Sequence, residues 1–446
     1  MDHEKQTHEP TMTTETNQQV LDSDSERDQQ HTGLSKQPSI CEKEDQDLDG
    51  WRGWLVVTAA ACSLFIYLGE IYSWGVLQSE LVKTTTFSMT TLTFVGSLAT
   101  SFMVSLSILV GMTIRRFGYQ KTAFAGAVLM GLGEFLASWV TDNLAGLFIC
   151  HSVLFGVGGG LTIMPCSTAP LRWFRKHRGL ATGIVFGGGS LGAATMSVAA
   201  NLLVTSVGVA WTLRIFGLLA WAVCVPAACL IRQPESAAAA VPQLQWYRFR
   251  ERQFILLFIG SALGCFPLFI PSYFIPIYAR TVSTQRVAVI ILAMWNIAST
   301  IGRVLAGFLA DAMLGPLNSL ILSLLLAGIS ALAIWPFASS VAVLSVFVVL
   351  NGLGCGAFFS LIPATVGSMF GAKNTMGVLP VLWAGWFFGY FFGSPIAAGI
   401  YSLSDKEADT AAYRPAAYYA GGMSLVGLAF IVVIRCLYSC KILARV

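Results

Sequence analysis

Charged residues are scarce in this chain of 446 residues. Asp, Glu, Lys and Arg make up 11% of it, whereas soluble domains carry about 25%. Hydrophobic residues make up 55%, in long runs that contain almost no charge. This composition excludes a typical soluble enzyme, because a soluble protein of this length needs polar surfaces around two or three domains. We therefore expect the lipid bilayer to be the solvent for most of the chain.

Signatures of disulfide frameworks, metal sites and cofactor sites are missing. The ten cysteines include no CxxC pair, and only His151 and His177 lie outside the N-terminal tail. Neither an ATP-binding P-loop nor a convergent catalytic set is present. We expect no disulfide, metal, cofactor, nucleic-acid partner or enzymatic activity. Seven cysteines lie instead within apolar runs: Cys62, Cys150, Cys166, Cys224, Cys229, Cys265 and Cys355.

The net charge of +4 is an average over two unlike parts. Residues 1–50 hold thirteen acidic and four basic residues, so this tail is strongly negative and the rest of the chain strongly positive. The tail is also rich in Gln, Thr and Ser and poor in aromatic residues, a composition typical of disorder. No apolar stretch precedes Trp51, so we expect no cleaved secretory signal and a cytosolic, solubilising tail.

Apolar windows of about 20 residues, the length that spans a bilayer as a helix, occur twelve times after the tail. Both chain ends then lie on the same side of the membrane. Basic residues concentrate in the loops on that side, which the positive-inside rule assigns to the cytosol. The windows begin near Trp54, Met89, Thr122, Leu144, Gly179, Trp211, Phe254, Val287, Leu317, Val341, Thr375 and Tyr413.

The two halves of the chain show weak internal similarity. A single offset of 196 residues relates Gly111 to Gly307, and Gly156 to Gly352. This pattern favours two related six-helix bundles, at residues 51–231 and 254–438. A segment with two prolines and an alanine run, residues 232–253, reads as a cytosolic linker, and residues 439–446 as a short cytosolic tail.

Four segments, in this order and spacing, resemble the monocarboxylate porter branch of the major facilitator superfamily, and its fungal members most. They are DGWRGW (Asp49 to Trp54), WFRKHRGLATGIVFGGGSLG (Trp173 to Gly192), NIASTIGRVLAGFLAD (Asn296 to Asp311) and GSPIAAGI (Gly393 to Ile400). The resemblance covers the chain after the tail. It implies an all-α membrane protein of twelve transmembrane helices in two six-helix bundles, which moves a small organic solute by alternating access.

Glycines in the fourth and fifth apolar windows also make sense without the family. They remove side chains where two helices approach closely in lipid, and so favour tight packing and sliding. Gly187 to Gly192 spells GxGxxG, the dinucleotide fingerprint, but it lies inside an apolar helix with no preceding strand. We interpret it as a packing motif.

Charged residues in and near two segments that resemble loops of the superfamily are candidates for gating. Gly111 to Lys121 (GMTIRRFGYQK) and Gly307 to Asp311 resemble the superfamily's loop between helices 2 and 3 and its repeat between helices 8 and 9, with Arg115 in place of the usual acid in the first copy. Pairing across helix ends would bias one conformation, and the alternative is that these charges only fix the topology. The gating candidates are Arg115, Arg116, Arg175, Lys176, Arg178 and Asp311.

Glu70 is the sharpest candidate for proton coupling. A charge near the bilayer centre costs about 2.5–3.5 kcal/mol, so such residues normally meet a cavity or a partner. Ser63, Tyr67 and Trp74 share its helix face by spacing, and we expect that face to line the transport path. The alternative is a protonated Glu70 that hydrogen-bonds a neighbouring helix.

Arg303 shares a stripe with Asn296, Ser299 and Gly307. Since Arg cannot neutralise itself, it needs an anion or carbonyl groups, and the resemblance implies a role in substrate or proton handling, with a structural salt bridge as the alternative. Animal monocarboxylate carriers have an aspartate where this chain has Ser299 and a lysine where it has Tyr72. Both departures count against a lactate-like symport.

Other polar and aromatic residues within the spans are weaker candidates for the transport path. We expect Glu134 to belong to a buried pair or to snorkel, His151 to pack or to line the pathway, and Arg214 to snorkel. The aromatic run of the eleventh span includes Trp386 and Tyr390, four residues apart, which are placed to stack on a flat or apolar solute.

These observations predict a secondary active transporter, a multi-pass protein of the cell membrane or an internal membrane that acts as a monomer. We expect it to export a secondary metabolite of moderate size, with proton coupling. The alternative is proton-linked uptake of a monocarboxylate or a vitamin-like solute. A channel or receptor would not require two repeats with glycine-packed helices, and accumulation against a gradient distinguishes a carrier from both.

Overall fold

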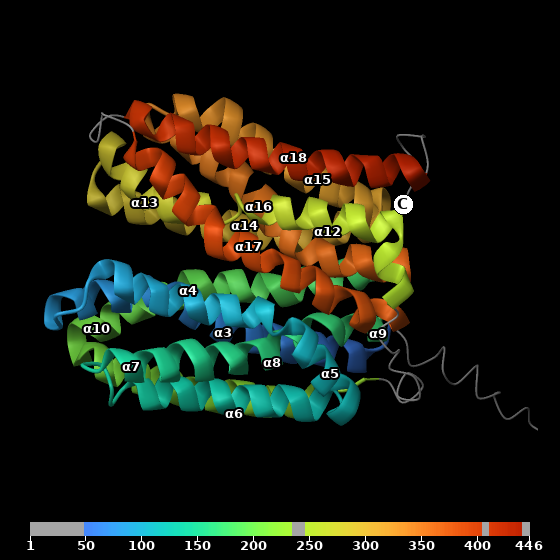
Figure 1. The fold of residues 1–446 in the computed structure, drawn as a ribbon, viewed down its shortest axis with the longest axis horizontal. Coiled ribbons are helices and arrows are strands. Elements are labelled where there is room, and N and C mark those ends of the chain that lie inside the picture. The colour runs from blue at the N-terminus through green and yellow to red at the C-terminus, as the bar shows by residue number, and fades with distance from the viewer. Residues whose placement is uncertain (1–48, 234–245, 404–409, 439–446) are drawn as a thin grey trace, which may run out of the picture. The chain divides into compact units, whose positions relative to one another are not determined.

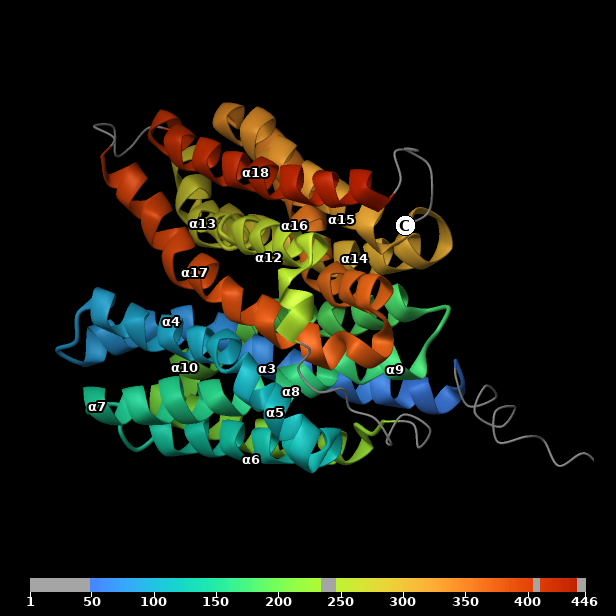
Figure 2. The same cartoon turned by 45° about the vertical axis from the view of Figure 1, so that its right-hand side comes forward.

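A computed structural model describes residues 49–233, 246–403 and 410–438. The described residues are almost entirely helical and include no strand. Most of the tail, part of the linker and the last eight residues lie outside this range, so the interpretations made for them concern residues that the structure does not describe. Figures 1 and 2 show the helices of residues 51–230 below those of residues 252–438 in both views.

The first half of the chain forms helices that are separated by short breaks. Ser88 begins the second span by accepting a hydrogen bond from the Thr91 N–H at 3.1 Å, an N-cap that satisfies a free donor of the first turn. The elements are α3 (Trp51–Thr84), α4 (Met89–Ser105), α5 (Ser107–Phe117), α6 (Tyr119–Ala137), α7 (Leu144–Leu147), the π-helical η1 (Phe148–Phe155), α8 (Gly156–Thr168), α9 (Pro170–Trp173) and α10 (Arg178–Leu230).

The second half repeats this pattern of helices and breaks. Ser340 begins α16 with the same kind of cap, on the Val343 N–H. The elements are η2 (Trp246–Arg250), α12 (Arg252–Cys265), α13 (Ile270–Val282), α14 (Gln285–Leu309), η3 (Ala310–Leu314), α15 (Pro316–Ile329), η4 (Ser330–Ile334), η5 (Trp335–Phe337), α16 (Val341–Phe370), η6 (Ala372–Asn374), α17 (Thr375–Ser402), η7 (Thr410–Tyr413) and α18 (Arg414–Tyr438).

Within the described residues, nine helical segments are long and apolar enough to cross a membrane, and α4 with α5, bent by 51°, makes a tenth. The 53 residues of α10 would extend about 80 Å at 1.5 Å per residue, far more than a bilayer, and Gly208 interrupts them with φ 81° and ψ 172°. Only glycine adopts this conformation readily, so α10 contains two crossings. The helix α6, 19 residues long and packed along α8 and α10, is not among these segments, and the expected twelve crossings are reached only if α6 is counted with them.

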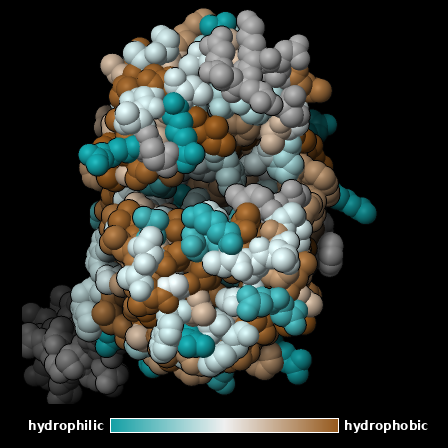
Figure 3. Space-filling model, turned by 90° about the vertical axis from the view of Figure 1, so that its left-hand side faces the viewer, coloured by the Kyte–Doolittle hydropathy of each residue, from teal (hydrophilic) through white to brown (hydrophobic). Residues whose placement is uncertain are grey.

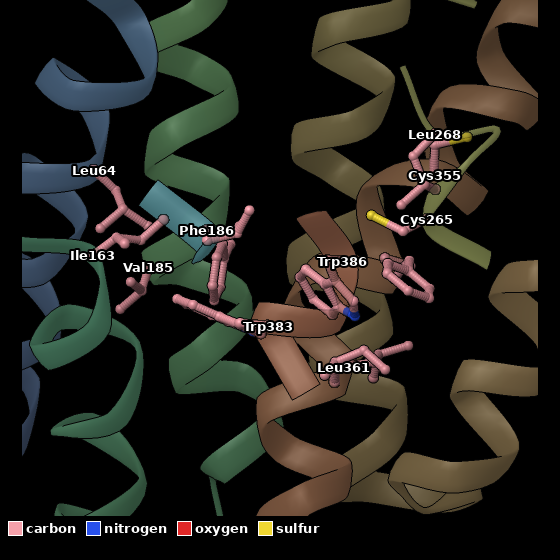
Figure 4. Close-up of a cluster of buried hydrophobic side chains, with 14 of the residues drawn as sticks. Leu64, Ile163, Val185, Phe186, Cys265, Leu268, Cys355, Leu361, Trp383 and Trp386 are labelled. Carbon is pink, nitrogen blue, oxygen red and sulfur yellow. The ribbon is translucent and has the colours of Figure 1, made fainter. Parts of the chain in front are cut away.

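The two halves meet mainly along α10 of the first half and α17 of the second. The first part of α10 packs along α14 and α16, and α17 packs along α4 and α5. Buried apolar side chains from both halves form one continuous cluster. Figure 4 shows Trp383 of α17 extending toward Val185 and Phe186 of α10 within that cluster. The end drawn at the left of Figure 1 is hollowed between the halves, as Figure 3 shows.

Within the first half, α3 and α10 lie so close that side chains would not fit between them. A Cβ atom on Gly192 would collide with the backbone oxygen of Phe65, and one on Gly188 would lie 2.7 Å from the oxygen of Ala61. The glycines of the expected packing motif therefore set the distance between these two helices.

We predict that Gly192→Ala destabilises the protein by about 1–3 kcal/mol, the usual cost of overpacking a filled interior. The added methyl group meets backbone, which cannot rotate away. Gly75→Ala on α3 is the matched control, because a Cβ there meets nothing within 4 Å. Thermal unfolding in detergent measures the difference, and equal midpoints for the two variants would contradict the packing argument.

Candidate functional site

Arg303 lies at the contact between the two halves, on α14. Its side chain is only 4% exposed, and one terminal nitrogen donates to the Phe186 backbone oxygen of α10 at 2.7 Å. The guanidinium carbon lies 5.2 Å from the centre of the Phe359 ring. Its Nε is buried without a hydrogen-bond partner. The guanidinium is thus oriented by one carbonyl and one aromatic ring, and keeps a free donor.

Aromatic side chains surround this arginine from both halves of the chain. The ring of Phe269, at the break between α12 and α13, lies 5.9 Å from Phe359, 4.8 Å from Tyr390 and 6.3 Å from Tyr72. Tyr72 and Tyr390 also lie within range of the Arg303 charge. We call Arg303 with these four aromatic residues the Arg303 site.

The composition of the Arg303 site suits a particular kind of ligand. A guanidinium presents a planar fork of donors that matches a carboxylate, and aromatic faces bind flat or apolar groups. Tyr72, Phe269 and Tyr390 are each partly exposed, and nearby Tyr273 is 59% exposed, so the site is not sealed. The arrangement can hold an organic molecule that carries one anionic or acceptor group on an apolar body.

Glu70 lies apart from the Arg303 site, inside the first half. It is 1% exposed, and neither carboxylate oxygen has a hydrogen-bond partner. Trp74, one turn further along α3, stacks on His151 at a ring distance of 3.9 Å and donates to the Leu92 oxygen. Glu70, Tyr67 and Trp74 do share one face of α3, as the spacing predicts, and that face is buried.

Glu134 belongs to a buried pair, and its partner in the structure is His151. The Nδ1 atom of His151 lies 2.8 Å from Oε1 of Glu134, an ion-pair distance without hydrogen-bond alignment, and each side chain is 1% exposed. Arg214 lies instead between the rings of Trp139 and Trp211 and donates to the Ser138 hydroxyl, an amphipathic placement consistent with snorkelling.

The remaining pathway candidates take structural positions around the Arg303 site. The Ser299 hydroxyl lies 3.4 Å from that of Ser190 across the two halves. Asn296 donates to the Leu292 oxygen within its own helix. Trp386 is 2% exposed and donates to the Ser261 hydroxyl inside the second half. Of the two aromatic residues singled out on α17, Tyr390 therefore belongs to the Arg303 site through its contact with Phe269, whereas Trp386 is buried inside the second half.

Asp311 joins the two halves at the end where the basic loops lie. Its two carboxylate oxygens accept the backbone N–H groups of Gly179 at 2.8 Å and Leu180 at 2.7 Å. These groups belong to the first turn of α10, where free donors and the helix dipole favour a negative charge. Gly179 and Gly307 bring the two backbones into contact there. This contact closes the two halves together at that end.

The equivalent contact between α5 and α17 uses no charge. The Ser107 hydroxyl donates to the Pro380 oxygen at 2.6 Å, and Gly111 lies against the Pro380 ring. The basic candidates lie around these contacts. Arg115 is partly buried, Arg116 lies over Phe117, the backbone N–H groups of Arg175 and Lys176 donate to the Asp49 carboxylate, and Arg178 donates to the Phe174 oxygen.

Sequence reasoning missed two parts of these arrangements. Phe269 and Phe359 were not singled out, because isolated phenylalanines in an apolar chain carry no signal of their own. A buried pair was predicted for Glu134 without its partner, and His151 was assigned to packing or to the pathway, although their side chains meet. The signal was available in part, since both are ionisable groups within apolar spans.

We predict that Asp311→Ala opens the end that carries the basic loops. Each charge-assisted hydrogen bond is worth about 1.5–3 kcal/mol, so its loss should populate the open form at least tenfold more. Spin labels on exposed Arg116 and Ala312, one in each half, report the distance across that end, in a background free of exposed cysteines. Asp142→Ala, in an exposed loop at the opposite end, is the control. An unchanged distance distribution in Asp311→Ala would show that Asp311 does not hold the end closed.

Comparison with known proteins identifies relatives along most of the chain. The family model of the Major Facilitator Superfamily matches residues 59–313 and 283–438. The MFS-type transporter pynF of Aspergillus niger is 30% identical over 363 residues, covering 80% of this chain and 83% of that protein. The MFS transporter asaE of Aspergillus flavus is 29% identical over 412 residues, with 90% of each chain covered. The Aspyridones efflux protein apdF of Emericella nidulans is 27% identical over 348 residues, covering 76% of this chain and 70% of that protein.

Solved structures agree on the fold. The MFS transporter FucP in its outward conformation superposes with a TM-score of 0.65 at 16% identity, covering 84% of this chain and 98% of that one. A variant of the E. coli fucose:proton symporter FucP gives 0.61 over the same shares. The all-α fold expected from the sequence is thereby confirmed. The chain belongs to the Major Facilitator Superfamily and is a multi-pass secondary transporter of small solutes.

Proposed function

We propose that this transporter exports an organic secondary metabolite of moderate size, which carries an anionic or acceptor group on an apolar body, in exchange for protons. The Arg303 site is the observation that carries the proposal. Its buried guanidinium has a free donor, and four aromatic rings from both halves surround it. A ligand there would contact both halves at once, as alternating access requires.

The aromatic composition and polarity of the Arg303 site favour a solute larger than lactate. Where animal monocarboxylate carriers have a lysine and an aspartate, this chain has Tyr72 and Ser299. Tyr72 faces Phe269, and Ser299 faces Ser190. Both replacements exchange charge for neutral contact surface. One cation then remains at the site, in an aromatic surrounding that suits a bulky monoanion.

The printed name of one relative, the Aspyridones efflux protein, supports export. We infer that this chain belongs with the fungal branch that resembles monocarboxylate porters and works in the cell membrane as a monomer. With the basic loops in the cytosol, as the positive-inside rule requires, both termini are cytosolic. The contact of Asp311 with α10 then closes the cytosolic end, and the hollow of Figure 3 faces outward.

The two helical halves, residues 51–231 and 254–438, are the bodies that would move, and residues 232–253 would link them. Proton entry supplies enough energy for useful export. One charge that crosses 100 mV yields about 2.3 kcal/mol, whereas a tenfold concentration ratio costs about 1.4 kcal/mol. Glu70 is our candidate for the group that couples the two fluxes, because its buried carboxylate lacks a partner.

Proton-linked uptake of a monocarboxylate or a vitamin-like solute is the second candidate. The observation that favours it is the single unneutralised cation of Arg303, which a small carboxylate would also satisfy. The two candidates differ in direction and in the size of the solute, and both can be measured in proteoliposomes.

We predict that reconstituted protein moves an aromatic carboxylate, with benzoate as the probe, against its gradient when protons flow the opposite way. Lactate and neutral benzamide are the comparison solutes, and protein-free vesicles correct for leakage. Glu70→Gln should keep benzoate exchange at equal pH but lose the dependence on the proton gradient. Accumulation in the same direction as the protons would establish uptake instead, and an unaltered pH dependence in Glu70→Gln would remove the coupling role.

We predict that Arg303→Ala lowers benzoate affinity by roughly 10- to 150-fold, since a hydrogen bond to a charged group is worth about 1.5–3 kcal/mol. Arg303→Lys should recover only part of the loss, because lysine keeps the charge without the planar fork. Exposed Arg280 on α13 provides the control, Arg280→Ala. Binding measured on detergent-purified protein, with thermal unfolding in parallel, tests this. Normal affinity and rate in Arg303→Ala would exclude the residue from the solute site.

A further inference from the structure

Three ionisable side chains are buried in one region of the first half, away from the Arg303 site, and two of them are in contact. Glu134 of α6 lies 2.8 Å from His151 of η1, and the His151 ring stacks on Trp74 of α3 at 3.9 Å. Glu70 lies one turn before Trp74 on the same face of α3, within electrostatic range of Glu134. All three ionisable residues are 1% exposed. We call Glu70, Glu134 and His151 the intramembrane triad.

The surroundings of the triad supply other titratable groups but no permanent cation. Tyr67 on the same helix, Cys150 on η1 and Cys224 on α10 lie within electrostatic range of its carboxylates. Among the described residues, no lysine or arginine forms an ion pair with Glu70 or Glu134. The triad therefore has to balance its own charge with protons.

The local backbone at His151 is unusual in a way that matters for this balance. His151 lies in the middle of η1, an eight-residue π-helical segment. Such segments are rare and are frequently found at functional sites. The described chain has two others, η3 and η4, and η1 is longer than either of these five-residue segments. The π-helical segment places the imidazole between Trp74, Phe155 and Glu134.

Two carboxyl groups and one imidazole can be neutral together when they hold two protons. Glu134 as carboxylate and His151 as imidazolium cancel, and Glu70 is neutral as the acid. Release of one proton leaves a net negative charge in an apolar interior, where a charge costs about 2.5–3.5 kcal/mol. The charge balance is therefore a property of the three residues together, set by the number of protons they hold.

Helix α3 links the triad to the Arg303 site. Tyr67, Glu70 and Tyr72 lie in sequence along α3. Tyr67 is fully buried against Phe155, with its hydroxyl unpartnered, and lies within electrostatic range of Tyr390. A change of charge in the triad thus acts on the helix that carries Tyr72 into the Arg303 site.

We propose that Glu70, Glu134 and His151 form one shared proton-binding site, separate from the solute site, and that this triad is the proton carrier of the transporter. The proton binds to a carboxylate oxygen of the triad from water on one side of the membrane and leaves to water on the other. The proposal deepens the proposed function on which it rests, because it assigns proton coupling to three residues instead of Glu70 alone.

Proton binding by the triad can be measured without any solute. Infrared absorption of protonated carboxyl groups is followed against pH in purified protein in lipid nanodiscs. Glu70→Gln should remove the triad's band, whereas Glu134→Gln and His151→Gln should each move its midpoint by at least about one pH unit, since each changes the charge that faces Glu70. The matched control is Glu80→Gln, the same change on α3 at a carboxylate that pairs with Lys83. Unmoved midpoints in both Glu134→Gln and His151→Gln would overturn the proposal.

A charge exchange distinguishes proton binding from packing. The double variant Glu134→His with His151→Glu keeps the pair in reversed positions, and it should restore the cooperative titration that each single change disturbs. The double variant also provides the test if one of the single variants fails to fold. If the infrared titration of the folded double variant is that of one independent carboxyl group, Glu70, the pair is only structural and the proposal fails.

Transport then separates this inference from the proposed function. In proteoliposomes, Glu134→Gln should keep benzoate exchange but lose proton-driven accumulation, with a concentration ratio of about 1 at steady state. Proton-driven accumulation at the wild-type level in Glu134→Gln would overturn the triad as carrier. Absence of benzoate movement in the wild type would count against the proposed solute class, while the infrared titration would still decide whether the triad binds protons as a unit.

Discussion

The close approach of α10 to two other helices is the constraint on which the rest of the structure depends. Glycines on α10 lie against α3 within the first half and against α14 of the second half. A helix that contacts both partners through backbone can be neither bulky nor charged along those faces. The same helix therefore sets the packing of the first half and the distance between halves, and it provides the carbonyl of Phe186 that orients Arg303.

Buried charges are stabilised in two different ways in this protein. Arg303 cannot lose its proton, so it is held by a carbonyl and an aromatic ring and retains a donor for a ligand. The intramembrane triad consists of groups that can exchange protons, so protons alone can balance it. In the proposed mechanism, the permanent charge at the contact between halves recognises the solute and the titratable charges inside one half bind protons, while α3 connects the two sites.

Hydropathy predicts the helices well, because a bilayer leaves few alternatives for an apolar chain. The observed starts of α4, α7, α16 and α17 coincide with the expected ones. The contacts between helices are harder to predict from the sequence. Glu134 and His151 lie on neighbouring helices, and a π-helical segment sets the direction of the imidazole, which helical spacing cannot anticipate. Phe269 lies at a break between two helices, where spacing gives no direction at all. The family resemblance supplied Arg303, but not its aromatic neighbours.

The two repeats differ at the end where they close, and the difference has a mechanical consequence. Asp311 accepts two backbone donors of α10, whereas the equivalent contact of the first half, between α5 and α17, rests on one serine hydroxyl and on the packing of glycine against proline. The sequence has Arg115 where the superfamily's loop between helices 2 and 3 has an acid. A charged contact is lost abruptly when its geometry is broken, while a packed contact can slide. The closed end is therefore held by two charge-assisted hydrogen bonds at one contact and by a single neutral hydrogen bond at the other, so the contact between α10 and α14, the helix that carries Arg303, is the stronger of the two.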